Sequence, residues 1–297
     1  MRVKRDRDAQ VGLCQIMRDL RAAFEDFCAA LDVLPASVGE SKAKGQHWVP
    51  RFYLRYFAID ESRKRVMLCS KADQLEWKPV AIDDICQQKR MYTPTDRDGA
   101  HFTSFEALLS RVENSAAELW RHLTPIILRW RPSDRTALAE FMAILHLRNA
   151  NLLGLCERVL KLRIQLYGLK DQGETEFNFD QPGPVFLETI MKAFGPIRDY
   201  FLDREWFFLR PAGSNRFITS DRPITFISLT GEIVGPKDKK ASVYMPISPD
   251  LAIFMASGTP DIDLRSASVP DELVDRVNLL SRHHAIRFFI SSGSLTG

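Results

Sequence analysis

The chain has 297 residues, of which 45% are hydrophobic and 27% are charged, and this balance excludes a largely disordered protein. The net charge of +3 is too small to indicate a dedicated nucleic-acid-binding protein by itself.

The five cysteines are odd in number and none are at CxxC spacing, so we expect neither disulfides nor a structural zinc site, but buried thiols in a reducing compartment. No apolar run reaches about 18 residues, and the start MRVKRDRDAQ lacks the apolar segment of a secretory signal, so we expect a cytoplasmic protein without a membrane partner.

The first 45 residues predict an extension made of one helix and a linker. Apolar residues at three- and four-residue steps predict an amphipathic helix over residues 9–31. The segment DVLPASVGESKAKG, residues 32–45, is typical of a linker because Pro, Ser, Gly and Lys cluster in it. This helix either packs on the main domain or contacts a protein partner or a second copy. We therefore divide the chain into an extension, residues 1–45, and one domain, residues 46–297.

Three long helices are expected in the middle of the chain. The apolar stripe from Phe105 to Leu123 predicts a helix over residues 103–123, which Thr103 or Ser104 can cap. Residues 133–170 predict one helix or two joined end to end, and its stretch ALAEFMAILHL is apolar almost all round, which is typical of a central, buried helix. A third helix is expected over residues 184–202, with an interruption at Gly195-Pro196.

Short strands dominate the sequence after residue 204. RVMLCS, residues 65–70, is an early strand, whereas EWFFLR, RFITS, ITFISL, SVYMPI and LAIFMA follow one another late in the chain. A last helix over residues 270–283 precedes a closing strand at 285–292. The prediction is an α+β fold with a helical N-terminal half, whose long central helices pack on a mixed or antiparallel sheet from the C-terminal half.

His47 lies among aromatic residues in QHWVPRFYL, residues 46–54. Such a histidine can act as a general base or a metal ligand whose pKa is tuned by its apolar surroundings. The alternative is a hydrogen-bonded core histidine or a helix cap. The chain contains no GxGxxG, GxxxxGK[ST], HExxH or GxSxG motif, so no phosphate-binding loop, zincin site or hydrolase nucleophile is indicated.

Glu106 and Glu113 are seven residues apart in the first long predicted helix. Two helical turns bring the two carboxylates to nearly the same face, about 10 Å apart along the axis. Neither has a Lys or Arg at the positions that form salt bridges within a helix. They either point into a cleft, where they could bind a divalent cation, or lie on the rim and pair with an arginine from another element.

Arg148 interrupts the apolar central helix together with His146, Asn149 and Asn151. A buried guanidinium is costly unless it is paired, so Arg148 needs either an anionic ligand or a carboxylate such as Glu106 or Glu113. The asparagines are expected to satisfy nearby backbone groups.

Asp221 follows the predicted strand RFITS and precedes Arg222-Pro223. A carboxylate at the end of a strand suits catalysis or metal binding, and it equally suits the capping of a turn.

The segment QHWVPRFYLRYF resembles the opening motif of DUF4238, an uncharacterised bacterial family. The resemblance continues through Glu106, Glu113 and Arg148, through Trp206, FITSDRPI (217–224) and MPISPD (245–250), and ends with Asn278. It covers about residues 46–297 and implies an α+β fold without an established reaction. It also marks His47 and Asp221 as candidate site positions.

Two hypotheses of function follow. The first is a hydrolase, specifically a metal-dependent nuclease of the bacterial toxin or antiviral defence type, acting on nucleic acid or nucleotides. Here His47 would be the general base and Arg148 the anion clamp, while Glu106, Glu113 and Asp221 would be acid groups or ligands of Mg²⁺ or Mn²⁺. The second is a non-catalytic binding or assembly protein in which the same residues form an internal structural network.

Overall fold

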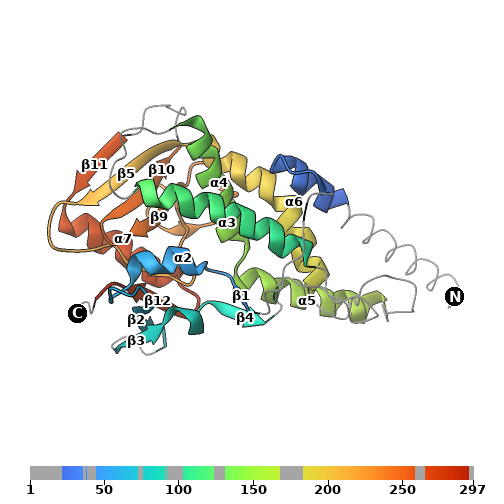
Figure 1. Cartoon of the computed structure of the whole chain (residues 1–297), viewed down its shortest axis with the longest axis horizontal. Helices are drawn as coiled ribbons and strands as arrows, with labels where there is room; N and C mark the ends of the chain where they lie inside the picture. The colour runs from blue at the N-terminus through green and yellow to red at the C-terminus, as the bar shows by residue number, and fades with distance from the viewer. Residues whose placement is uncertain are drawn as a thin grey trace, which may run out of the picture. The chain divides into compact units, whose positions relative to one another are not determined.

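The computed structural model of the chain is a mixture of helices and strands (Figure 1). It describes residues 22–35, 38, 45–72, 76–89, 91, 103–123, 131–167, 183–257 and 265–293. A helix over residues 22–30 precedes the labelled elements. The helices are α2 (Arg51–Leu54), α3 (Ser104–Leu123), α4 (Pro132–Leu147), α5 (Ala150–Tyr167), α6 (Gly183–Leu202) and α7 (Asp271–His284), with short 3₁₀ turns η2 (Arg55–Phe57) and η3 (Ile82–Asp84).

The strands form three sheets in the described part of the chain. The two-stranded sheet contains β1 (Gly45–His47) and β4 (Gln87–Lys89). The four-stranded sheet has the order β3-β2-β12-β6, with β2 (Arg65–Ser70), β3 (Trp77–Ala81), β6 (Thr219–Ser220) and β12 (Phe288–Ser291). The six-stranded sheet has the order β11-β5-β10-β9-β7-β8, with β5 (Glu205–Pro211), β7 (Thr225–Ile227), β8 (Ile233–Val234), β9 (Ser242–Ser248), β10 (Leu251–Ala256) and β11 (Arg265–Val269).

The chain divides into two compact units that are interleaved in sequence. Unit 1 comprises Met1–Gln46, Gln88–Arg111 and Ala150–Gly195, and unit 2 comprises His47–Gln87, Val112–Asn149 and Pro196–Gly297. Helices α3 and α6 each begin in unit 1 and end in unit 2. Both larger sheets belong to unit 2.

Unit 2 is layered around its six-stranded sheet. Val274 and Val277 of α7 pack on one face, in a cluster with Tyr244 of β9 and Leu209 of β5. Trp206 and Leu209 are three residues apart in β5, so their side chains lie on opposite faces of the sheet. On the face of Trp206, the Arg135 guanidinium of α4 lies 4.6 Å from the centroid of the Trp206 ring. The sheet is mixed, because β11 pairs parallel to β5 while its other strand pairs are antiparallel.

Helix α4 is buried along most of its length, as the apolar stretch predicts. Phe141 is fully buried and its ring lies 5.1 Å from that of Trp120 and 5.3 Å from that of Phe52, all within unit 2. The Trp120 indole Nε1 donates to the Ile247 carbonyl at 3.1 Å, so this large buried side chain has its polar atom satisfied.

Unit 1 contains the helix over residues 22–30, which packs against other parts of the same unit. Phe27 is 1% exposed, and its ring lies 5.5 Å from that of Phe105 and 4.8 Å from that of Phe194. Residues 9–21 of the predicted helix lie outside the described residues. Cys28 of this helix is buried, as are the free thiols of Cys69, Cys86 and Cys156, which agrees with the expected small hydrophobes.

The mixed α and β composition is confirmed, but the prediction of a helical N-terminal half is wrong. Strands β1 to β4 lie between Gly45 and Lys89, before the first long helix of the described residues. The reason is that β2 pairs antiparallel with the closing strand β12. Phe288 of β12 lies opposite Ser70, and Ser291 lies opposite Met67. Strand β2 therefore pairs on one side with its neighbour in sequence, β3, and on the other with a strand more than 200 residues away.

Candidate functional site

Arg148 lies at the end of α4 and forms an ion pair with Glu113 of α3. Its Nη1 donates to the Glu113 Oε1 at 2.5 Å, and its Nε donates to the Trp48 carbonyl at 3.4 Å. The Arg148 side chain is only 2% exposed, whereas that of Glu113 is 28% exposed. The guanidinium is therefore engaged by one carboxylate and one carbonyl, which is the pairing that a buried arginine requires.

The sequence predicts one helix or two joined end to end over residues 133–170, and the structure has a break at Arg148. Helix α4 ends at Leu147 and α5 begins at Ala150. The Asn149 Nδ2 donates to the His146 carbonyl at 2.6 Å, so this asparagine satisfies a helix-end backbone group as expected. The break allows Arg148 to leave the helix axis toward Glu113.

Trp48 connects Arg148 to Asp221. Its carbonyl accepts from Arg148, and its indole Nε1 donates to the Asp221 carbonyl at 3.2 Å. Its backbone N–H donates to the Cys86 carbonyl at 2.8 Å, and the Arg287 guanidinium lies 5.6 Å from the centroid of its ring. The aromatic residue of the opening motif is thus a link between chain segments distant in sequence.

The Asp221 carboxylate accepts two backbone hydrogen bonds. Its Oδ1 accepts from the Ile286 N–H and its Oδ2 from the Arg287 N–H, both at 2.8 Å. Burial raises the pKa of this carboxyl, and the two amide hydrogen bonds oppose that effect. Asp221 therefore fixes the segment between α7 and β12.

His47 is half-buried at the end of β1. Burial lowers the pKa of its imidazole, and Arg51 adds to this effect, whereas Asp83 opposes it through its charge and a backbone hydrogen bond. Asp83 is itself paired with Arg51, Nη1 to Oδ1, at 3.1 Å. A neutral imidazole near neutral pH suits either a general base or a core histidine.

Glu106 lies in the first turn of α3, where its charge favours the helix N-terminus. It falls in unit 1, whereas Glu113, two turns along the same helix, falls in unit 2. Among the described residues, no group of three or more His, Cys, Asp or Glu is arranged to hold a metal ion. The proposed Mg²⁺ or Mn²⁺ site of Glu106, Glu113 and Asp221 stays a prediction.

Two histidines outside the predicted site are buried in unit 2. His146 near the end of α4 is 9% exposed, and His284 at the end of α7 is 6% exposed. Burial, with Arg222 as the next cause, lowers the pKa of each imidazole to about 3. His146 was visible in the sequence as a polar residue within an apolar run, but nothing in the sequence links it to His284.

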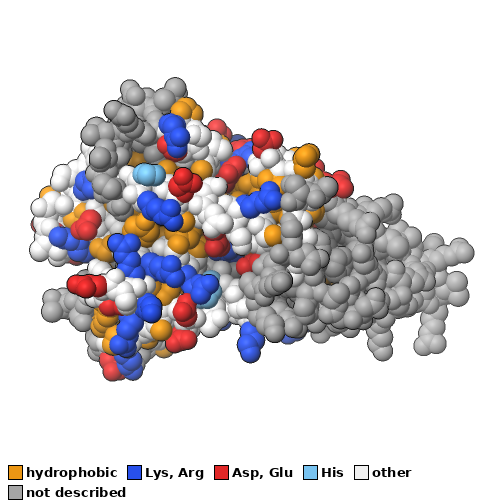
Figure 2. All heavy atoms as spheres, viewed as in Figure 1, with side chains coloured by type: hydrophobic (Ala, Val, Ile, Leu, Met, Phe, Trp, Pro, Cys, Tyr) orange, Lys and Arg blue, Asp and Glu red, His pale blue; other side chains and the backbone are white. Residues whose placement is uncertain are grey.

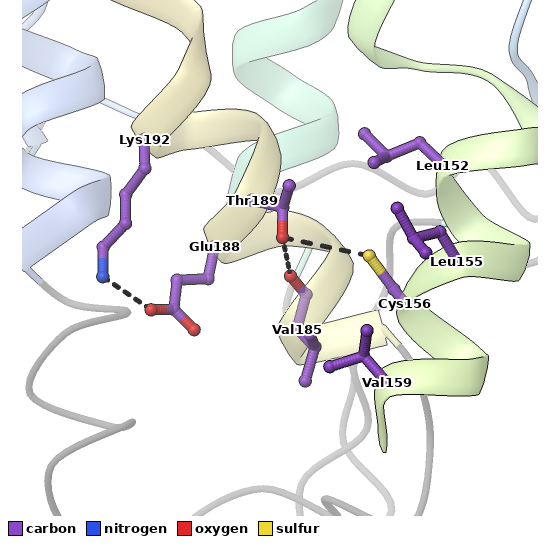
Figure 3. Close-up of a pocket in the computed structure, with 8 residues that line it drawn as sticks. All are labelled: Leu152, Leu155, Cys156, Val159, Val185, Glu188, Thr189 and Lys192. Atoms are coloured by element: carbon purple, nitrogen blue, oxygen red, sulfur yellow. Dashed lines mark hydrogen bonds and ion pairs between the residues drawn. The ribbon is translucent and has the colours of Figure 1, made fainter. Parts of the chain in front are cut away.

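Unit 1 contains a pocket of about 210 Å³ between α5 and α6 (Figure 3). Its polar groups are engaged with one another: Lys192 pairs with Glu188 at 2.7 Å, and the Thr189 hydroxyl donates to the Val185 carbonyl at 2.7 Å. The Cys156 thiol lies 3.8 Å from the Thr189 hydroxyl. The remaining lining is aliphatic, so the pocket offers shape and apolar surface rather than reactive groups.

No helix among the described residues combines the length and the hydropathy needed to cross a bilayer. Comparison with known proteins finds no match among curated proteins and none among solved structures. The family model described as "Protein of unknown function (DUF4238)" matches residues 45–294, which is most of the chain. The resemblance carried by the opening motif and the later segments is thereby confirmed, and the chain belongs to the DUF4238 family.

Proposed function

We propose that this chain is a non-catalytic binding protein in which Glu113, Arg148, Trp48 and Asp221 form a structural network. The observation that supports this most directly is the guanidinium of Arg148, which is almost fully buried and directed at the Glu113 carboxylate and the Trp48 carbonyl. A group that holds an anionic substrate needs to be reached by that substrate.

The network joins parts of unit 2 that are far apart in sequence. The Glu113–Arg148 pair links α3 to the end of α4, Trp48 extends the link to Asp221, and the Asp221 carboxylate holds Ile286 and Arg287. Removing one partner of a buried ion pair leaves an uncompensated charge, which costs about 3–5 kcal/mol. Such a network stabilises one arrangement of helices and sheets.

An anionic partner fits the surface of the same unit. Figure 2 shows Lys and Arg side chains gathered on the face where Figure 1 places α2, β2 and β3. Exposed basic residues of these segments include Arg51 of α2, Arg65 of β2 and Lys78 of β3. Clustered cations attract polyanions at long range, which supports nucleic acid or nucleotides as the partner class.

The test compares Glu113→Gln with Glu118→Gln, the same change at an exposed position of α3. Because Gln leaves Arg148 without its counter-charge, we expect Glu113→Gln to lower the Tm by about 5–10 °C, measured by circular dichroism. Glu118→Gln is expected to shift the Tm by less than about 1 °C. The double variant Glu113→Gln/Arg148→Met should cost less than the sum of the single variants, because it removes both buried charges.

The hydrolase hypothesis makes the opposite prediction. Under that hypothesis the wild-type chain with Mg²⁺ or Mn²⁺ cleaves DNA, RNA or nucleotides, and Glu113→Gln retains the wild-type Tm while losing that cleavage. Finding both results would overturn the proposed structural role.

A further inference from the structure

Positive charge is concentrated in residues 51–65 of unit 2. This segment contains five Arg or Lys residues and two acidic ones, and its excess of three positive charges equals the net charge of the whole chain. All five basic residues are exposed. Figure 2 shows Lys and Arg side chains bordering hydrophobic ones on the face where Figure 1 places α2. A local excess of cations on a chain that is otherwise close to neutral attracts polyanions to this place.

The Arg63 guanidinium is exposed and forms no ion pair with a carboxylate among the described residues. The Asp60 carboxylate of the same turn accepts instead from the backbone N–H groups of the two residues that follow Arg63, at 3.1 and 2.8 Å. The Asp83 carboxylate is bound by Arg51 at 3.1 Å. Neither Asp60 nor Glu61 pairs with Arg63, so this cation is available to an external anion.

Arg63 also occupies a backbone conformation that does not favour arginine. Its φ is 53°, in the left-handed region, where residues other than Gly, Asn and Asp are uncommon. Its N–H donates to the Asp60 carbonyl at 3.0 Å, so the residue closes a tight turn before β2. Asn or Gly would form this turn at a lower conformational cost, so the turn itself does not require a guanidinium. The role of this arginine therefore lies in its side chain.

The Arg63 side chain lies over the ring of Tyr56. The guanidinium carbon is 5.7 Å from the ring centroid, and Tyr56, in η2, is half-buried. Arg121, near the C-terminal end of α3, is a second exposed cation that acts on this tyrosine. Burial raises the pKa of the Tyr56 phenol, and both arginines oppose that effect. Nucleobases stack on aromatic rings and on guanidinium planes, while phosphates accept from the same guanidiniums.

We propose that Arg63, Tyr56 and Arg121 form a binding surface for single-stranded nucleic acid. The phosphates accept hydrogen bonds from the two guanidiniums, and an unpaired base stacks on the Arg63–Tyr56 pair. A duplex would use only the charges, because its bases are already stacked on one another. The inference rests on the proposed binding function and names its partner, but it does not involve the Glu113–Arg148 network, whose guanidinium is buried.

The experiment measures the anisotropy of fluorescein-labelled oligonucleotides titrated with the full chain at about 100 mM KCl. The probes are single strands of deoxythymidine and of uridine, about 20 nucleotides long, and a DNA duplex of the same length. Charge alone favours the duplex, because it carries more phosphates per unit length. We expect the single strands to bind at least about fivefold more tightly, with the tighter of the two identifying DNA or RNA. Equal or tighter binding of the duplex, or no saturable binding of any probe, would refute the proposal.

Arg63→Asn is compared with Arg276→Gln, a change at an exposed arginine of α7 that removes the same charge. We expect Arg63→Asn to weaken single-strand binding at least about fivefold and Arg276→Gln to change it less than about twofold. Because Asn adopts a positive φ more readily than Arg, the Tm of Arg63→Asn should equal or exceed that of the wild type, which separates lost binding from lost folding. Unchanged affinity in this variant would show that the strand binds elsewhere, and only the general binding function would stand.

Arg63→Lys separates stacking from charge, because lysine keeps the positive charge but lacks the planar group. We expect this variant to weaken single-strand binding at least about threefold while duplex binding changes less than about twofold. An equal loss for both probes would contradict the stacking contact. The Tm of Glu113→Gln is measured independently, so a failure of this surface and a failure of the structural network are told apart.

Discussion

Glu140 shows how one half-buried side chain makes stability depend on pH. It lies on α4, and burial raises the pKa of its carboxyl to about 7, while Arg198 acts in the opposite direction. In the unfolded chain the pKa of a glutamate is about 4.3, so the folded state binds this proton more tightly than the unfolded state does. The contribution of Glu140 to the free energy of unfolding is therefore expected to fall as the pH rises from about 4.5 to about 7, and then to level off.

Glu140→Gln tests this directly because glutamine stays neutral over the whole range. We expect the variant to match the wild type near pH 4.5 and to be more stable by about 1–2 kcal/mol at pH 8, a figure reduced for partial solvent screening. Urea unfolding at pH 4.5, 6, 7 and 8 gives the measurement, with the exposed Glu118→Gln as the control. A stability difference that does not change with pH would show that the carboxyl is not destabilised by burial.

The residues of the candidate site differ in how far the sequence could reveal their partners. Glu113 was one of the two carboxylates named for Arg148, because a buried arginine needs a counter-charge. The partners of Asp221 are backbone amides of Ile286 and Arg287, which have no signature in side-chain identity. The approach of His146 to His284 depends on where two helices end, which the sequence fixes only to within a few residues.

At the scale of elements, hydrophobic periodicity predicted the positions of the long helices well. Gly and Pro residues predicted the interruptions of helices less reliably. The structure shows two helices, α4 and α5, within the predicted range 133–170, which was one of the two alternatives. In contrast, α6 continues from Gly183 to Leu202 through Pro196, without the expected interruption. Proline removes one backbone hydrogen bond and can bend a helix, but the packing of an apolar face can outweigh that local cost.

The variant Gly195→Ala tests how much helix propensity at this position contributes to the stability of α6. A Cβ at this position would have no heavy atom within 4 Å, and glycine inside a helix costs about 0.5–1 kcal/mol relative to alanine. We therefore expect Gly195→Ala to raise the Tm by about 1–3 °C in a calorimetric scan.

Gly213→Ala is the contrasting control. Its Cβ would collide with the Asp271 carboxylate, which accepts from the backbone N–H groups of Ser214 and Asn215 at 3.3 and 3.0 Å. This variant should lower the Tm. If both variants shifted the Tm in the same direction, the predicted effect of helix propensity at Gly195 would not hold.

For the whole molecule, strand identities were easier to predict than strand partners. Hydrophobic alternation and β-branched residues marked β2, β5, β9 and β10, because these features depend on neighbours in sequence. The pairing of β2 with β12, and the parallel addition of β11 to β5, depend on closing long loops, which no local pattern specifies. The two units are also interleaved in sequence, and α3 and α6 each begin in one unit and end in the other.

The segment before the family match gives a prediction for the whole chain. The family model begins at residue 45, yet Phe27 is buried in unit 1 against Phe105 and Phe194. Deleting residues 1–44 exposes those two rings to water, and the loss of a buried Phe side chain alone costs about 3–5 kcal/mol. We therefore expect faster hydrogen exchange, measured by mass spectrometry, in α5 and in the unit 1 parts of α3 and α6.

The control for this deletion is Leu34→Ala, a change at a side chain that is 77% exposed, which should leave exchange unchanged throughout. Peptides from β9 and β10 in unit 2 serve as the internal reference, because the ring contacts of Phe27 with Phe105 and Phe194 lie in unit 1. Unaltered protection of α5 and α6 after the deletion would mean that the segment is an independent extension, as its linker-like composition suggests. Increased exchange confined to unit 1 would instead make residues 22–30 part of the folded core, although they precede the matched family region.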